Sequence, residues 1–204
     1  MSPLLSELNR LYFVHHTERP NGDAQASNLV AADGRVRAMV LELARPTDWN
    51  TLATVWRGVQ SDLGLPAPAI AVSGIDGHQL WFSLAEPVSA ADARVFLEAL
   101  CVRYLGAVDP WRIGVLPGFD AQAPHQAQHA RLVPALQAEN GHWSAFVSSD
   151  LAAIFTDEPW LDLEPAPEAQ DRLLSRLECI KPDAFQASMN LLKPAAGTAV
   201  SGTA

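Results

Sequence analysis

The stretch from Ala69 to Glu86 reads AIAVSGIDGHQLWFSLAE, and it decides the fold predicted for this chain. Gly74 and Gly77 lie in its middle, where glycine tolerates the positive φ that a tight reversal needs. Apolar residues on both sides follow the spacing of strands. They are Ile70 and Val72 before the reversal, and Leu80, Phe82 and Leu84 after it. We therefore predict a β-hairpin.

The tip of this hairpin gathers polar side chains at one end of the predicted sheet. They are Ser73, Asp76, His78 and Gln79. A polar cluster at the mouth of a hairpin is typical of a binding site, and it is equally typical of a solvated turn. These residues alone leave both interpretations open.

The composition indicates a globular protein without a membrane partner. The chain has 204 residues, of which 49% are hydrophobic and 18% charged, enough to fill one α/β domain with a core. No apolar run approaches the ~20 residues of a membrane span. The first residues lack the basic region and apolar core of a signal peptide, so we expect a cytoplasmic protein.

The charge of the chain disfavours strong, autonomous binding of nucleic acid. The formal net charge is −9 and the isoelectric point is near 5.0. Phosphate contacts dominate nucleic-acid affinity, and proteins specialised for them usually present a basic face. A local basic site remains compatible with this charge.

The order of predicted elements indicates an α+β fold with an antiparallel-rich sheet packed by helices. A first helix spans 3–16, and strands at 24–31 and 36–44 are joined by Asp33-Gly34, a hairpin signal. The remaining predicted elements are a helix at 47–63 begun by Thr47, the 69–86 hairpin, a helix at 89–105, a strand at 113–116, and helices at 169–180 and 184–192.

Three segments are predicted along the chain. Residues 1–136 form the α+β core, and residues 137–193 form a C-terminal helical extension packed on it. Residues 194–204 are small and polar, which predicts a disordered tail.

Common catalytic motifs do not occur in the sequence. His125 and His129 have the i, i+4 spacing of zinc ligands, but the glutamate of an HExxH motif is missing. G-x-S-x-G and the glycine-rich phosphate loops do not occur either. Cys101 and Cys179 lie in apolar helical patterns and fit no metal spacing, so we expect two buried thiols.

Several short phrases in the right order resemble one known family. They are Ser73-Gly74-x-x-Gly77-x-Gln79-Leu80-Trp81, then Leu84-x-Glu86-Pro87-Val88, then Leu105-Gly106-Ala107 with Asp109, and finally Leu116-Pro117-Gly118-Phe119. Over residues 25–120 the chain resembles the RepB-type plasmid replication primases of the archaeo-eukaryotic primase superfamily. The resemblance implies a primase core of the RRM-like type and a replication protein of a plasmid or an integrated mobile element.

The resemblance also implies roles for single residues. Glu42 and Asp109 correspond to metal-binding catalytic carboxylates of the family. Ser73, His78 and Gln79 correspond to nucleotide-binding positions, and Arg112 stands for the family's basic residue, displaced by several positions. The family has two acids on the strand where this chain has only Glu42. We therefore expect a degenerate primase with weak or absent nucleotidyl transfer. No cofactor is certain, and Mg²⁺ or Mn²⁺ would be needed if transfer is retained. The implied partners are nucleotides or single-stranded DNA, bound weakly, and another replication protein.

Two other functions remain open at this point. A non-enzymatic adaptor would use the acidic surface, the C-terminal helices and the segment from Asp157 to Asp162, in which Trp160 is an aromatic anchor. A small-molecule enzyme would use His78 and Asp76. Convergence of Glu42, Gln79 and Asp109 in space would favour the polymerase function.

Overall fold

The computed structural model describes residues 2–14, 26–45, 49–118 and 129–193. Within these residues the chain forms an α+β fold with a six-stranded antiparallel sheet, in the order β5-β2-β4-β3-β8-β7. A second, two-stranded sheet pairs β1 with β6. The strands are β1 Ala26–Asn28, β2 Arg35–Ala44, β3 Ala69–Val72, β4 Gly77–Ser89, β5 Ile113–Leu116, β6 His129–Arg131, β7 Ala135–Leu136 and β8 Trp143–Val147.

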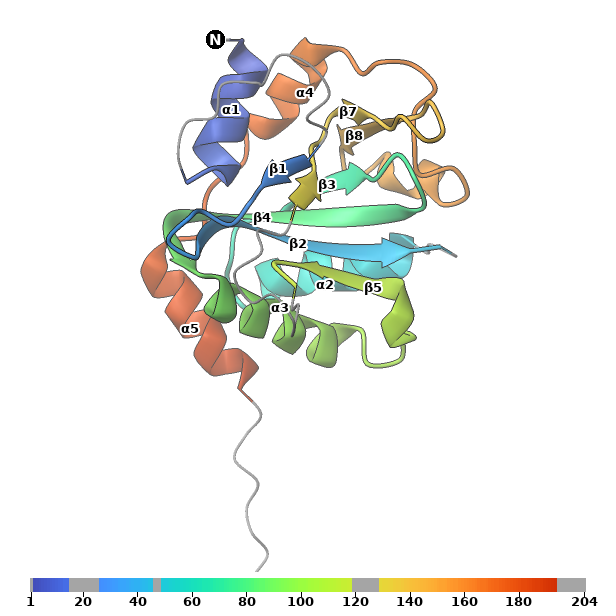
Figure 1. The fold of residues 1–204 in the computed structure, drawn as a ribbon. Coiled ribbons are helices and arrows are strands. Elements are labelled where there is room, and N and C mark those ends of the chain that lie inside the picture. Colours follow the sequence, from blue (N-terminus) through green and yellow to red (C-terminus); the bar gives the residue numbers. More distant parts are fainter. Residues whose placement is uncertain (1, 15–25, 46–48, 119–128, 194–204) are drawn as a thin grey trace, which may run out of the picture.

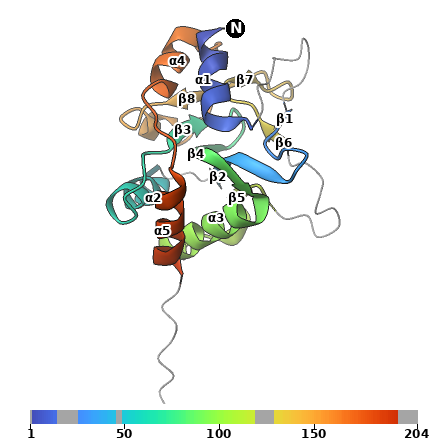
Figure 2. The same cartoon turned by 90° about the vertical axis from the view of Figure 1, so that its left-hand side faces the viewer.

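Helices cover both faces of the large sheet (Figure 1). One face carries α1 and α4, and the opposite face carries α2, α3 and α5, with α5 running beside α3 in both views (Figure 2). The α-helices are α1 Pro3–Tyr12, α2 Trp49–Ser61, α3 Ala90–Tyr104, α4 Pro167–Leu174 and α5 Pro182–Leu192. Two short 3-10 helices are η1 Pro110–Arg112 and η2 Ala152–Phe155.

Local sequence explains where several of these elements begin. The Ser2 hydroxyl accepts from the backbone N–H of Leu5, and Pro3 occupies the first turn of α1. Ser89 does the same for α3 by accepting from the backbone N–H of Asp92, whose carboxylate suits a helix N-terminus. Both caps satisfy backbone donors that a helix leaves unpaired at its start.

Two apolar clusters fill the layers on either side of the sheet. On the α1/α4 face, the Tyr12 ring packs edge-on against Trp81 and stacks on Phe146. On the other face, Phe96 packs against both Phe82 and Phe185. Since the side chains of a strand alternate between faces, neighbouring residues of β2 and β4 belong to different clusters.

The C-terminal residues are part of the main layers of the fold. β8 pairs with β3 inside the large sheet, and the buried Gln170 side chain of α4 bonds to both the N–H and the C=O of Phe146. α5 packs on α3 on the opposite face. The α+β, antiparallel prediction is confirmed, whereas the C-terminal helical appendage is not. The predicted boundary after residue 136 lies in the β7–β8 hairpin, and the division into segments stays a prediction.

The hairpin predicted for residues 24–31 and 36–44 is present only in part. Beside the Asp33-Gly34 turn, Val30 forms an antiparallel bridge with Val36, and the N–H of Ala31 donates to the carbonyl of Arg35. β1 itself pairs with β6, and β5 pairs with Val40–Leu43 of β2. α1 ends at Tyr12 and α4 at Leu174, earlier than the helical patterns predict. Thr47, His125 and the tail 194–204 lie outside the described residues.

None of the helices in the described ranges is long and apolar enough to cross a membrane.

Candidate functional site

The candidate site lies at the end of the large sheet where β2 ends and β4, β5 and β8 begin. Glu42 sits near this end of β2, directly opposite Gln79 of β4 and Gly114 of β5. The Nε2 of Gln79 donates a hydrogen bond to Oε2 of Glu42 over 3.0 Å. Two residues that the sequence singled out therefore meet on adjacent strands near this end of the sheet.

A neighbouring indole orients the Gln79 amide. Trp81 lies two residues further along β4, on the same face, and its Nε1 donates to Oε1 of Gln79 over 2.8 Å. Because the indole can only donate, Gln79 must present its oxygen to Trp81 and its nitrogen to Glu42. Trp81 is 3% exposed, so the chain Trp81–Gln79–Glu42 holds the carboxylate in one orientation.

Two glycines make room for the Glu42 side chain. A Cβ on Gly77 would lie 3.0 Å from Oε1 of Glu42 and 2.8 Å from the carbonyl oxygen of Leu43. A Cβ on Gly114, on the other side, would lie 3.5 Å from the Cβ of Glu42, which is an ordinary contact. The half-buried carboxylate thus occupies a slot whose β4 wall has space only for glycine.

Two arginines flank the end of β2. The Nε of Arg112 donates to the carbonyl oxygen of Ala44 over 3.4 Å. Arg45 follows Ala44 directly, and its backbone N–H donates to the carbonyl of Asp76 over 2.8 Å. Its exposed guanidinium lies 5.5 Å from the centre of the Trp160 ring, within the range of a cation–π contact.

An aromatic pair continues the site towards β8. The rings of His142 and Trp160 are stacked, with centroids 4.6 Å apart and planes inclined by 23°. Trp160 is held there because its neighbours bond to the sheet end: Gly74 donates to the carbonyl of Pro159, and Trp143 exchanges backbone bonds with Leu161. The Asp162 carboxylate lies 4.0 Å from Nε2 of His142.

Ser73 is engaged in the turn that joins β3 to β4. Its buried hydroxyl oxygen accepts from the backbone N–H groups of Ile75, Asp76 and Gly77, at 3.2, 3.1 and 2.9 Å. These contacts account for a serine at this position by turn geometry alone. Its role in nucleotide binding stays a prediction.

His78 points to the opposite face from Gln79. It is 1% exposed, its Nε2 bonds to the carbonyl of Ala152 over 2.9 Å, and its ring lies 5.9 Å from that of Trp49. Burial lowers the pKa of this imidazole, and the Ala152 carbonyl opposes part of that effect. The structure therefore brings Gln79 to Glu42 and turns His78 into the α2 layer.

Asp109 lies outside the sheet. It is exposed at the start of η1, in the connection between α3 and β5, and its side chain makes no capping bond. Among the described residues, no group of three or more His, Cys, Asp or Glu side chains is placed to hold a metal ion. These residues therefore do not fit the several carboxylates that a two-metal centre requires, and the role assigned to Asp109 stays a prediction.

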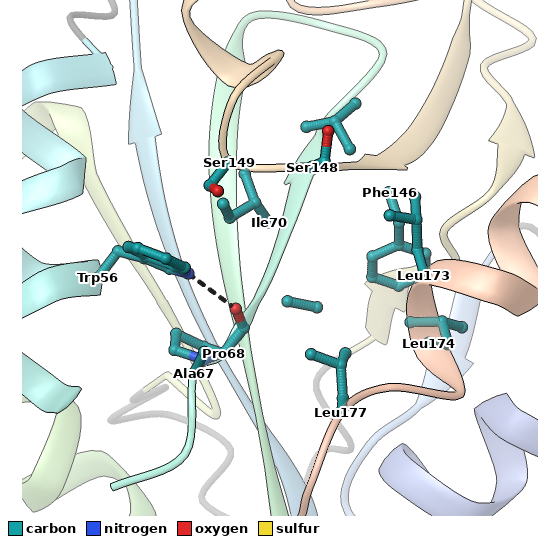
Figure 3. Close-up of a pocket in the computed structure, with 12 residues that line it drawn as sticks. Trp56, Ala67, Pro68, Ile70, Phe146, Ser148, Ser149, Leu173, Leu174 and Leu177 are labelled. Atoms are coloured by element: carbon teal, nitrogen blue, oxygen red, sulfur yellow. Dashed lines mark hydrogen bonds between the residues drawn. The ribbon is translucent and has the colours of Figure 1, made fainter. Parts of the chain in front are cut away.

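A separate pocket of about 120 Å³ lies beside the first residue of β3 (Figure 3). Its walls are mostly apolar, with Trp56 and Pro68 on one side and Phe146, Leu174 and Leu177 on the other. The Nε1 of Trp56 donates to the carbonyl of Pro68 over 3.1 Å. None of the predicted site residues lines this pocket.

Sequence reasoning missed part of the site. Arg45 and His142 were not singled out, and neither was Trp111, which is 73% exposed next to Arg112. Trp160 was noticed only as an anchor for a protein partner. A signal was present for Arg45, because it directly follows the strand predicted at 36–44.

Comparisons with known proteins give weak matches. No protein-family model matches the chain, and no curated protein matches its sequence. Among solved structures, the primase-polymerase AEP domain of cyanophage S-2L is 16% identical, with a TM-score of 0.33 over 69% of this chain. The polymerase domain of Mycobacterium tuberculosis ligase D, solved in complex with DNA, is 17% identical, with a TM-score of 0.41 over 72% of this chain. The matches span 61% and 57% of those two chains. At these TM-scores the similarities do not place the chain in a family.

Proposed function

We propose that this chain is a primase-like replication protein that binds nucleotides or single-stranded DNA at the Glu42 end of the sheet, with weak or absent nucleotidyl transfer. The setting implied by the sequence resemblance is a plasmid or an integrated mobile element. The observation that supports the proposal is that two of the sequence phrases lie next to the strand that carries Glu42. The Glu42 strand, the Ser73–Trp81 hairpin and the strand before Pro117 lie on adjacent strands.

The donor set around Glu42 is the reason to expect weak transfer. Two-metal nucleotidyl transfer uses carboxylates to hold ions against the attacking and leaving oxygens. Glu42 contributes one carboxylate, and Gln79 already donates to one of its oxygens. Arg45 and Arg112 supply positive charge for a phosphate beside it. Such a site is better suited to binding ligands that carry phosphate than to catalysing nucleotidyl transfer.

Primer synthesis is the direct test. The chain is incubated with a single-stranded DNA template, deoxynucleotides and Mg²⁺ or Mn²⁺, while template binding is followed separately by fluorescence anisotropy. We expect template binding with little or no primer, and loss of any residual synthesis in Glu42→Ala. Rapid synthesis that Glu42→Ala leaves unchanged would contradict the proposal, and so would a chain that binds neither DNA nor nucleotide.

Exposed apolar residues favour the adaptor function as a second candidate. Val95 and Val102 on α3 are 45% and 80% exposed, and Leu191 on the neighbouring α5 is 57% exposed. Exposed apolar side chains on neighbouring helices are a feature of protein-binding surfaces. This candidate would be supported if the unmodified chain bound a purified protein partner but neither DNA nor nucleotides, and if Val102→Glu abolished binding of that partner.

A further inference from the structure

Aromatic and basic side chains form a row across the Glu42 end of the sheet. Arg112 immediately precedes β5, Arg45 immediately follows β2, and His142 immediately precedes β8. Because neighbouring strands lie about 4.8 Å apart, the four steps from β5 to β8 span roughly 19 Å. Trp111 adjoins Arg112 at one end of this width, and Trp160 stacks on His142 at the other. We call these five residues the aromatic–arginine row.

The members of the row differ from the tryptophans of the core. Trp81 is buried and bonded to Gln79, whereas Trp111 is 73% exposed. Trp160 is half-buried, and the exposed side chain that lies over its ring is Arg45, a cation. The row therefore presents one open aromatic ring, that of Trp111, and a second ring, that of Trp160, which contacts His142 and Arg45.

We propose that the aromatic–arginine row binds single-stranded DNA. Phosphates are bound by Arg45 and Arg112, and bases stack on Trp111 and on the Trp160 face that Arg45 vacates when it binds a phosphate. This inference rests on the proposed function and names the residues through which it acts. Stacking requires unpaired bases, so the row selects single strands over duplex DNA. The net charge of −9 makes the rest of the surface repel a polyanion, so affinity depends on stacking more than in a basic protein.

Acidic groups restrict where phosphates can lie. Asp76 occupies the turn between β3 and β4, and Asp162 lies beside His142. The Asp162 carboxylate disfavours a phosphate next to the β8 end of the row. Arg45 and Arg112 favour one next to the end of β2, where Asp76 lies beside Arg45. The phosphate contacts are therefore expected from these two arginines, and the His142–Trp160 pair is expected to contact the base.

The test measures binding of a fluorescein-labelled oligothymidylate of about 20 nucleotides, longer than the ~4–16 nucleotides that one small binding fold covers. Anisotropy titrations of the full chain are repeated at several salt concentrations. Trp111→Ala and Trp160→Ala are each expected to weaken binding about 5-fold or more without changing the salt dependence. The Arg45→Ala/Arg112→Ala double variant should reduce the slope of log K against log salt by about 1.4, at about 0.7 for each phosphate that the variant no longer neutralises.

Matched controls separate the row from general surface effects. Arg57→Ala removes an exposed arginine on α2, and Val95→Ala trims an exposed apolar residue on α3. Both are expected to bind like the unmodified chain. Thermal unfolding of every variant shows whether it folds; if Trp160→Ala does not, Trp111→Ala decides the outcome, because its exposed side chain supports little of the fold.

The outcomes distinguish this inference from the proposed function. If the unmodified chain binds the oligonucleotide and the row variants bind equally well, the row is not the binding surface, although the proposed function stands. If the unmodified chain does not bind the oligonucleotide, the inference is overturned, and the proposed function is overturned with it if the chain also fails to bind nucleotides. Weaker binding in the row variants but not in the controls supports the inference.

Discussion

Replacing Gly77 by alanine tests the slot that holds the Glu42 side chain. The new Cβ would lie 2.8 Å from the carbonyl oxygen of Leu43 and 3.0 Å from Oε1 of Glu42. Leu43 belongs to the paired backbone of β2, which cannot withdraw without breaking its ladder. Overpacking of this kind typically costs about 1–3 kcal/mol. In a chain of this length each kcal/mol lowers the melting temperature by roughly 2–4 °C, so we expect a decrease of about 2–12 °C.

The neighbouring glycine on the other side of Glu42 is the control. In Gly114→Ala the added Cβ meets Glu42 at 3.5 Å, an ordinary contact. Alanine also restricts the unfolded chain, which can stabilise the fold by about 0.4–1 kcal/mol. We expect an unchanged or slightly raised melting temperature for this variant.

Thermal and urea unfolding, followed by circular dichroism, measure both variants. If Gly77→Ala is as stable as the unmodified chain, or if Gly114→Ala is destabilised as much as Gly77→Ala, the claim that only glycine fits beside Glu42 on β4 is refuted. A double variant with Glu42→Ala refines the result. Because Glu42→Ala removes the carboxylate that the new Cβ at position 77 would contact, the double variant should be destabilised by less than the sum of the two single effects.

Two further predictions concern buried groups. Gln170→Leu leaves the N–H and C=O of Phe146 unpaired inside the protein. At about 1–3 kcal/mol for each group, the free energy of unfolding should fall by about 2–6 kcal/mol. Urea unfolding measures this decrease against the exposed-site control Gln186→Leu, and a decrease below about 1 kcal/mol would contradict the role of Gln170 in bonding to Phe146. Burial lowers the pKa of His78, so between the usual value near 6.5 and its lower folded-state value the unfolded chain binds more protons. His78 therefore supports stability above about pH 6.5, and that support is lost as the pH falls. In His78→Phe, the free energy of unfolding should decline less between about pH 7 and pH 5 than in the unmodified chain. An identical decline would show that another group is responsible.

The central hairpin was predictable because its determinants are local. The strand patterns around Ser73–Gly77 specify the β3–β4 reversal, and the same patterns explain why Gln79 and Trp81 share one face. The Asp33-Gly34 turn was also local, and Gly34 does adopt positive φ there. Its strands nevertheless pair over only a short stretch at the Val30–Val36 bridge, because β1 pairs with β6 and β5 pairs with Val40–Leu43 further along β2. The residues of a turn do not specify which distant strands will pair with the strands on either side of it.

The candidate site was predictable only in part. Glu42 and Gln79 were named from short phrases, and their contact follows from the register of β2 against β4. His78 was placed with them because it adjoins Gln79 in sequence, but alternation along a strand sends adjacent side chains to opposite faces. The contact between Arg45 and Trp160 joins residues far apart in the chain, and no periodicity in the sequence indicates it.

The most direct test of DNA binding at this end of the sheet is an NMR titration of the isotopically labelled chain with oligothymidylate. We expect the largest shifts at the amides of Arg45, Gly77, Arg112 and Trp143, and at the indole N–H groups of Trp111 and Trp160. The amides of α3 and α5, on the opposite face, should stay in place. Shifts concentrated on α3 and α5, or none at saturating oligonucleotide, would contradict a DNA-binding site beside Glu42.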